Sequence, residues 1–180
     1  GSFSSMDGVK EFVKEYLKEC RKTSNLVNNV GSYLIKSAMN TTVEEMADLF
    51  QINLYAPFFL MQQLSSFIVQ EKGSIINIGV AGINQIRSEN YSTAYSLTKM
   101  NLLMLTKSFG KALSPFGVSV NMVSPGILEN SIDAFQNIEN IPMRRFGNFK
   151  EVADVVLFLL NRDNRYITGQ NIEVAGGVRL

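Results

Sequence analysis

The sequence predicts an α/β fold in which helices alternate with the strands of a parallel sheet. Short β-rich runs recur along the chain, and helical segments of ten or more residues separate most of them. One run, residues 74–78, is apolar except at its edges and centre, as is typical of a strand buried on both faces. Consecutive parallel strands need such crossovers, so we expect right-handed βαβ units with helices covering both faces of the sheet.

The individual elements follow from apolar spacing and from helix-capping residues. Residues 4–7 form a capping-box-like start for a helix over 6–21. Either Thr41 or Thr42 is expected to cap a helix with glutamates in its first turn, and the continuation of this helix over about 47–70 is expected to be mostly buried. The other predicted elements are strands at 25–27, 74–78, 118–123 and 172–174 and helices at 92–113 and 149–160.

Length and composition limit the class of protein. The 180 residues (20.1 kDa) suffice for one domain spanning 1–180, and an apolar fraction of 46% with 18% charged residues predicts a packed core. Seventeen basic and sixteen acidic side chains give a charge of +1 without a Lys/Arg cluster, so no nucleic-acid partner is expected. No run approaches about 18 uninterrupted apolar residues, and no signal pattern precedes the first helix. We therefore expect a cytoplasmic protein without a membrane partner.

The absence of histidine excludes several kinds of catalytic site. Ser-His-Asp and Cys-His nucleophilic sites and HExxH zinc sites all need that residue, and we expect no metal site. The single cysteine, Cys20, cannot form an internal disulfide, and it follows a charged run at the expected end of the first helix. A structural role in a reducing compartment fits it best. Any proton transfer must use other side chains.

The best proton-transfer pair in the chain is Tyr95 with Lys99. Residues at i and i+4 share one face of a helix, and a nearby cation favours the phenolate and so lowers the pKa of a tyrosine. The alternative is an ordinary aromatic beside a solvated cation.

Three segments are candidates for ligand binding, because ligands of open α/β sheets bind beyond the carboxyl ends of the strands. They are residues 28–31, 79–82 and 124–128. The irregular stretch 124–148 is expected to form a functional lid.

The order of these motifs resembles the C-terminal two-thirds of a short-chain dehydrogenase/reductase, and especially members similar to 3-oxoacyl-acyl-carrier-protein reductase. The matching segments are Asn28-Asn29-Val30-Gly31 for the NNAG turn, Gln51-Ile52-Asn53-Leu54, Tyr95-Ser96-Leu97-Thr98-Lys99 for YxxxK, Pro125-Gly126-Ile127-Leu128 for the PG turn, and Ile167-Thr168-Gly169-Gln170 followed by Glu173-Val174-Ala175-Gly176-Gly177. The resemblance implies a Rossmann-like doubly wound parallel sheet.

The resemblance also implies an NAD(P)-dependent oxidoreductase that reduces a carbonyl by hydride transfer. In that reaction Tyr95 would protonate the carbonyl oxygen, Lys99 would lower the pKa of Tyr95 and hold the nicotinamide ribose, and Asn53 would steady a water in the proton relay. The substrate would be a small molecule or an acyl thioester, with 3-oxoacyl reduction, as in fatty acid biosynthesis, as the first choice. Enoyl reduction is the alternative.

Nine residues are expected, from the same resemblance, to contact NAD or NADP. They are Asn28, Val30, Gly31, Ile78, Tyr95, Lys99, Pro125, Gly126 and Leu128. In the alternative interpretation, Asn28 and Asn29 do not contact a cofactor and only satisfy backbone groups at a turn. Arg144 and Arg145 either bind a phosphate, for instance of an acyl carrier, or are solvated.

The chain departs from the family pattern in two places. The family usually places a serine directly after the strand predicted at 74–78, whereas residues 79–82 carry no hydroxyl, and Ser88 or Ser92 is the candidate replacement. No TGxxxGxG turn is present, so we expect a fold that is incomplete at its N-terminal, phosphate-binding side and a chain that alone neither binds NAD(P) tightly nor turns over. The alternative function is a non-catalytic interaction domain. The family likeness implies a homodimer or homotetramer that pairs the helices at 47–70 and 92–113.

Overall fold

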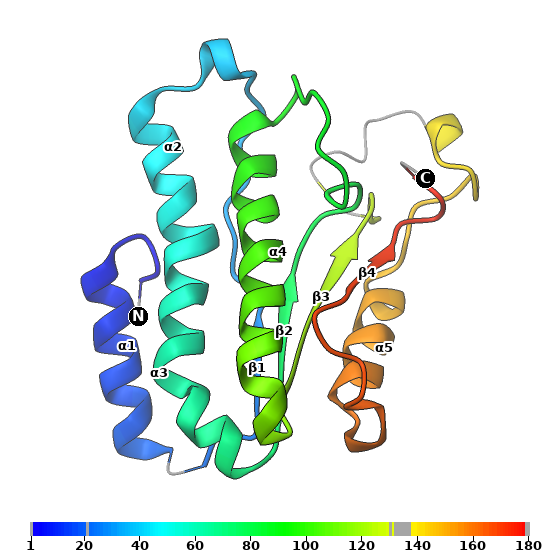
Figure 1. The fold of residues 1–180 in the computed structure, drawn as a ribbon. Coiled ribbons are helices and arrows are strands. Elements are labelled where there is room, and N and C mark those ends of the chain that lie inside the picture. The colour runs from blue at the N-terminus through cyan, green and yellow to red at the C-terminus, as the bar shows by residue number, and fades with distance from the viewer. Residues whose placement is uncertain (1, 21, 130, 132–137, 179–180) are drawn as a thin grey trace.

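The fold is built on a sheet of four parallel strands (Figure 1). The computed structural model describes residues 2–20, 22–129, 131 and 138–178. The strands are β1 (Asn25–Asn28), β2 (Ser74–Ile78), β3 (Ser119–Pro125) and β4 (Asn171–Val174), and they lie in the order β1-β2-β3-β4. This confirms the predicted α/β class and the parallel sheet.

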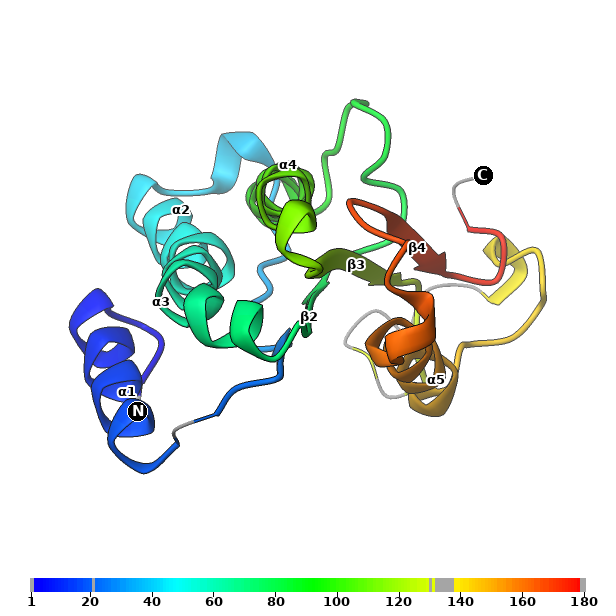
Figure 2. The ribbon, with the colours of Figure 1, turned by 60° about the horizontal axis from the view of Figure 1, so that its bottom comes forward.

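Helices cover both faces of the sheet (Figure 2). The helices are α1 (Met6–Glu19), α2 (Val43–Phe50), α3 (Ala56–Gln70), α4 (Thr93–Leu113) and α5 (Phe149–Leu160). Successive side chains of a strand point to opposite faces. Accordingly, Ile75 of β2 packs in a core cluster with α1, α3 and α4, whereas Ile76 packs with Leu159 of α5. The predicted three-layer arrangement is therefore confirmed.

The crossover between β3 and β4 differs in hand from the two before it. The connections β1–β2 and β2–β3 carry their helices over one face, whereas α5 lies on the other, although the strands step across the sheet in a single direction. The expectation that every crossover is right-handed is therefore wrong. Right-handed crossovers are a strong preference rather than a rule without exceptions, and this connection is one of the exceptions.

The helix expected over 47–70 is divided by a π-helical turn, Gln51–Tyr55. Pro57 lacks an N–H and cannot donate to the carbonyl of Asn53, so the regular i to i−4 ladder cannot pass through this point. The chain widens instead, and the backbone N–H of Ala56 donates to the carbonyl of Gln51, five residues earlier. Single π-turns inside helices are frequent at functional sites, and this one contains Asn53.

The helix ends follow from capping residues. Thr42, the second of the two predicted caps, forms a full capping box with Glu45, and the helix begins at residue 43 with Glu44 and Glu45 in its first turn, as predicted. Ser5 caps α1, which ends at Glu19 with Cys20 as its C-cap, two residues before the predicted end. Helix α5 has the predicted bounds. Short 3-10 helices occupy Ala38–Asn40, Ser114–Phe116, Ile138–Asn140 and Arg162–Asn164.

One helical run within the described residues, Val43–Gln70, is long and apolar enough to cross a membrane by length and composition alone. The criterion of uninterrupted apolar residues missed it because polar residues interrupt the run. Its α3 part buries Leu60, Met61, Leu64 and Ile68 in the main core cluster. A core helix passes the same test, so the run is explained by packing against the sheet.

Candidate active site

A cavity of about 360 Å³ opens beyond the carboxyl ends of β2 and β3. This is the place where open α/β sheets bind their ligands. The residues that line the cavity are Tyr33, Ile78, Gly79, Val80, Ala81, Tyr91, Ser92, Tyr95, Ser96, Pro125, Gly126, Ile127, Ser131 and Val178. Of the nine residues predicted to contact a cofactor, Ile78, Tyr95, Pro125 and Gly126 lie on this wall.

Helix α4 brings Tyr95 and Lys99 together at the cavity. The Lys99 Nζ lies 5.6 Å from the centroid of the Tyr95 ring. Lys99 is 5% exposed, and its Nζ donates a hydrogen bond of 2.8 Å to the carbonyl of Ile78 at the end of β2. Lys99 is therefore a buried cation held between helix and sheet, which excludes the alternative of a solvated lysine.

Burial changes the acid–base behaviour of Lys99. Loss of water around the ammonium group lowers the pKa of Lys99 from its ordinary value of 10.5 to about 8. The side chain is therefore still mostly protonated near neutral pH and becomes neutral above about pH 8. In the charged state it favours the phenolate form of a neighbouring tyrosine.

Asn53 ties the segment after β1 to helix α4. Its Oδ1 accepts from the backbone N–H of Ser32 at 2.8 Å, and its Nδ2 donates to the Ser32 carbonyl at 2.9 Å and to the Thr98 hydroxyl at 3.1 Å. The side chain is completely buried. Asn53 thus holds in place the two segments that flank Lys99, and its predicted contact with a water of the proton relay stays a prediction.

Gly31 lies directly against this buried pair. A Cβ at position 31 would stand 3.3 Å from the Oδ1 of Asn53 and 3.5 Å from the Nζ of Lys99, so a larger residue would press on both. Among the residues that the structure describes, the Ile78 carbonyl is the one hydrogen-bond acceptor of the Lys99 ammonium, which has three N–H donors. The remaining donors beside a bare glycine fit the hydroxyls of a nicotinamide ribose.

The predicted contact residues on β1 are placed differently. Asn28 is buried, and its Nδ2 donates to the Oδ1 of Asn77 at 2.7 Å, while Asn77 in turn donates to the hydroxyl of Thr106 at 2.9 Å. This side-chain bridge between strands was not considered for Asn28 from the sequence, and the cofactor contact of Asn28 stays a prediction. Val30 is 54% exposed and does not line the cavity beside Tyr95.

Tyr33 is a site residue that the sequence did not reveal. Its ring meets the ring of Tyr95 edge to face, with centroids 4.6 Å apart and an interplanar angle of 83°. Such pairs stabilise a ring orientation. Tyr33 stands two residues beyond Gly31, after the carboxyl end of β1, so the same rule that selected residues 28–31 finds it when the window is extended.

The connection after β3 places Ile127, rather than the predicted Leu128, at the cavity. Ile127 lines the cavity, whereas Leu128 does not: it pairs with Gly147 in an isolated β-bridge, and a Cβ at Gly147 would meet Leu128 Cδ2 at 2.9 Å. The expected cofactor contact of Leu128 therefore lacks support from its position. Residues 130 and 132–137 of the expected lid lie outside the described residues, but Ser131 is on the cavity wall.

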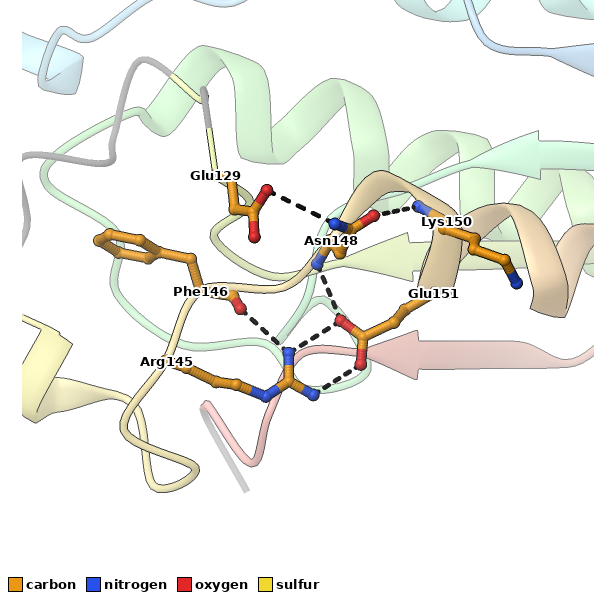
Figure 3. Close-up of polar contacts among 6 residues, drawn as sticks. All are labelled: Glu129, Arg145, Phe146, Asn148, Lys150 and Glu151. Carbon is orange, nitrogen blue, oxygen red and sulfur yellow. Dashed lines mark hydrogen bonds and ion pairs between the residues drawn. The ribbon is translucent and has the colours of Figure 1, made fainter.

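Arg145 is held by an acidic partner (Figure 3). Its guanidinium donates two hydrogen bonds to the carboxylate of Glu151, of 2.9 and 2.6 Å, and Glu151 also accepts from the backbone N–H of Asn148. The hydrogen bonds from Arg145 and then from Asn148 lower the pKa of Glu151 to about 2, and the same pair raises the pKa of Arg145. Arg144 donates to the carbonyl of Glu139. Arg145 is thus paired within the chain, not simply solvated.

The segment that follows β2 is anchored to β4. The carboxylate of Glu173 accepts from the backbone N–H of Gly82 and from the side chain of Asn84, both at 3.0 Å. Asn171 in turn donates to the Oδ1 of Asn84 at 3.0 Å. These bonds fix the path of the cavity wall before α4 begins. No three His, Cys, Asp or Glu side chains in the described part of the chain gather where they could hold a metal ion.

Comparison with protein families and curated proteins gives consistent matches. A family model described as enoyl-(acyl carrier protein) reductase matches residues 3–179. The 3-oxoacyl-[acyl-carrier-protein] reductase FabG of Buchnera aphidicola from Acyrthosiphon pisum is 32% identical over 185 residues, which cover 98% of this chain and 75% of that protein. FabG of Aquifex aeolicus is 37% identical over 163 residues, covering 85% of this chain and 64% of that protein.

Solved structures agree with the fold. A short-chain dehydrogenase/reductase of Serratia marcescens superposes on the whole chain and on 75% of its own, with a TM-score of 0.90 at 22% identity. A blue fluorescent protein from a metagenomic library, in complex with NADPH, gives a TM-score of 0.90 at 25% identity over 99% of this chain and 74% of its own. The Pseudomonas aeruginosa RhlG/NADP complex gives 0.87 at 25% identity over 99% of this chain and 75% of its own.

Proposed function

Because the chain belongs to the short-chain dehydrogenase/reductase family, we propose that it is an NAD(P)-dependent reductase of a carbonyl group, with a 3-oxoacyl thioester as its substrate. The observation that carries this proposal is the pairing of Tyr95, on the wall of the cavity, with the buried cation of Lys99.

Each site residue has a separate role in the proposed reaction. The nicotinamide cofactor supplies the hydride. Tyr95 gives its phenolic proton to the carbonyl oxygen of the substrate, and the charge on Lys99 stabilises the phenolate that remains. Lys99 also offers its remaining N–H donors to the ribose, beside the space that Gly31 leaves open. The edge-to-face contact with Tyr33 keeps the reacting ring in one orientation.

The substrate class rests on the relatives and on the cavity wall. The curated relatives named above act on 3-oxoacyl groups by their names, and the wall includes Ile78, Val80, Ile127 and Val178, which suit an acyl chain. The description of the matching family model favours a second candidate, reduction of an enoyl thioester. Both reactions use the same cofactor, so the substrate alone distinguishes them.

A panel of substrates with NADH and NADPH tests the proposal. Purified full-length protein is expected to oxidise the cofactor with a 3-oxoacyl thioester and more slowly with a simple ketone, and Tyr95→Phe is expected to lose at least about 100-fold in kcat. Tyr166→Phe is the matched control because Tyr166 is fully exposed. Turnover of an enoyl thioester alone would favour the second candidate. Unchanged biological activity of Tyr95→Phe would favour a non-catalytic interaction domain.

We also propose that two copies of the chain associate through α3 and α4. Leu97, Asn101, Met104 and Ser108 lie at helical spacing on the exposed side of α4, with Met104 68% exposed. Phe58 of α3 is partly exposed and contacts the ring of Phe109 of α4, so the apolar surface continues between the two helices. Met104→Glu is expected to shift the protein from dimer or tetramer toward monomer in light-scattering measurements. A monomeric wild type would refute this assembly.

A further inference from the structure

The reaction proposed above needs a second hydrogen-bond donor at the substrate oxygen, and the inference that follows rests on that proposed function. As negative charge develops on a carbonyl oxygen, a preorganised donor beside the proton donor stabilises the transition state. The wall segment after β2, residues 79–82, carries no hydroxyl. The donor must therefore come from elsewhere on the cavity wall.

Three of the four positions after β2 have little room for a hydroxyl-bearing side chain, and the fourth, Val80, is apolar. A Cβ at Gly79 would lie 2.3 Å from the Oγ of Ser124 and 2.6 Å from the Sδ of Met122, closer than real contacts allow. Gly82 has a φ of 86°, a left-handed conformation that disfavours other residues. Ala81 is 4% exposed and donates its backbone N–H to the Pro125 carbonyl at 2.9 Å. Replacement of these residues would disturb the wall.

Ser92 is placed where such a donor is required. It lines the same cavity as Tyr95, and the residue is 6% exposed. Its backbone is fixed on both sides, because its N–H donates to the Oε1 of Glu89 and its carbonyl accepts from the N–H of Ser96. The point at which the Ser92 side chain joins the cavity wall is therefore fixed, and a donor held in place before the reaction is what preorganisation requires.

The Ser92 hydroxyl is not used to cap helix α4. Serine at an N-cap position ordinarily accepts a hydrogen bond from a backbone N–H of the first turn. Ser92 occupies the N-cap position of α4 with φ −145° and ψ 54°, and its side chain makes no such bond. The hydroxyl is therefore left for the cavity.

The helix brings Ser92 and Tyr95 to one side. Ser92 is the N-cap of α4 and Tyr95 is the third residue of the helix, and side chains at these two positions are near enough to meet in a capping box. Ser96 also lines the cavity, but it is adjacent to Tyr95 in sequence and so lies about 100° around the helix axis. Ser131 donates its hydroxyl to the carbonyl of Leu128, and Ser88 is exposed and outside the wall.

We propose that the Ser92 hydroxyl donates a hydrogen bond to the substrate carbonyl oxygen that Tyr95 protonates. The hydride adds to the carbonyl carbon, the C=O π pair moves to oxygen, and the oxygen takes the proton of Tyr95 to give the alcohol. Ser92 keeps its own proton throughout. Its contribution lies in the charge that it stabilises on the oxygen before the proton arrives.

Steady-state kinetics on the full-length protein with its cofactor and the best 3-oxoacyl substrate test this role. Ser92→Ala is expected to lower kcat by about 10²–10³-fold while KM changes by less than about fivefold, because the lost bond acts mainly in the transition state. Ser92→Thr keeps the hydroxyl and is expected to recover most of the rate. Ser88→Ala, which removes an exposed serine outside the cavity wall, is the matched control and is expected to stay near wild type.

The outcomes separate this inference from the proposed function. If Tyr95→Phe loses activity and Ser92→Ala keeps a kcat within about threefold of wild type, the role of Ser92 is refuted and the reductase remains. A loss in Ser96→Ala without one in Ser92→Ala would move the donor to Ser96. A wild type without turnover, or an active Tyr95→Phe, would refute both. Thermal melting and cofactor titration of each variant show that a lost rate is not lost folding.

Discussion

Replacing Lys99 by methionine is expected to change the pH dependence of stability. The unbranched methionine side chain fills much of the same space without a charge. Burial lowers the pKa of Lys99 to about 8, against 10.5 for the group in water. Between these values the unfolded chain binds the proton more tightly than the folded chain does. Lys99 therefore destabilises the fold below about pH 8, and the penalty fades as the pH rises toward 10.5.

The magnitude follows from the size of the shift. Each pKa unit is worth about 1.4 kcal/mol, so protonating the buried amine lowers the free energy of unfolding by roughly 3 kcal/mol at about pH 7. At about pH 9.5 the penalty falls to roughly 1.4 kcal/mol. Loss of the hydrogen bond to the Ile78 carbonyl lowers the free energy of unfolding of the variant by about 1–3 kcal/mol at every pH. The change with pH, about 2 kcal/mol, is thus the quantity that isolates the charge.

Urea unfolding of wild type and Lys99→Met at a series of pH values measures this change. Wild type is expected to gain about 2 kcal/mol relative to the variant between about pH 7 and pH 9.5. Lys107→Met is the control, since Lys107 lies two turns further along α4 and is exposed. A difference between wild type and Lys99→Met that does not vary with pH would refute the buried-cation argument. The same loss of charge predicts that reductase activity falls above about pH 8.

Three further predictions concern the residues that support the site. Asn53→Ala is expected to lower the free energy of unfolding by about 2–4 kcal/mol, because it leaves part-buried backbone groups of Ser32 unpaired. The exposed control Asn40→Ala is expected to change it by less than about 0.5 kcal/mol, and chemical denaturation compares the two variants. Glu173→Ala is expected to cost about 1–2 kcal/mol and to speed proteolysis within residues 79–92, and Glu173→Gln, which keeps the acceptor, should not. The pKa of Glu151, about 2 in the folded chain against 4.5 in water, means that its contribution to stability is present above about pH 4.5 and fades as the pH falls toward 2; NMR titration should find the pKa of its carboxyl raised in Arg145→Gln.

Local signals predicted the parts of the fold that depend on neighbouring residues. Helix α5 has its predicted bounds because Asn148 and Glu151 form a capping box immediately before an apolar helical stretch. The helix expected over 47–70 has the predicted apolar face, but it is not α-helical throughout. Pro57 removes one hydrogen-bond donor, and a π-turn is present just before it. Apolar spacing alone does not report such a local change in helical pitch.

Features that depend on contacts between residues far apart in the sequence could not be predicted from local sequence patterns. Tyr33 and Tyr95 meet through tertiary packing, and no spacing rule links the two positions. Ser88 and Ser92 were equivalent candidates in the sequence, and burial on the cavity wall separates them. The opposite hand of the last crossover likewise has no local signal in the sequence, because it follows from the face of the sheet on which α5 packs.

The proton-transfer end of the site is organised by bonds within this chain. Asn53 joins Ser32 to Thr98, and Lys99 is bonded to the end of β2, so folding alone places the cation beside Tyr95. A buried charge of this kind opposes stability, which a purely structural residue at the same position would not do. Its retention beside a tyrosine on a cavity wall therefore favours a chemical role, since natural sequences carry such penalties mainly at functional sites. The pH-dependent part of the stability difference between wild type and Lys99→Met measures the penalty of the charge, and the reductase rate lost in the same variant measures its chemical contribution.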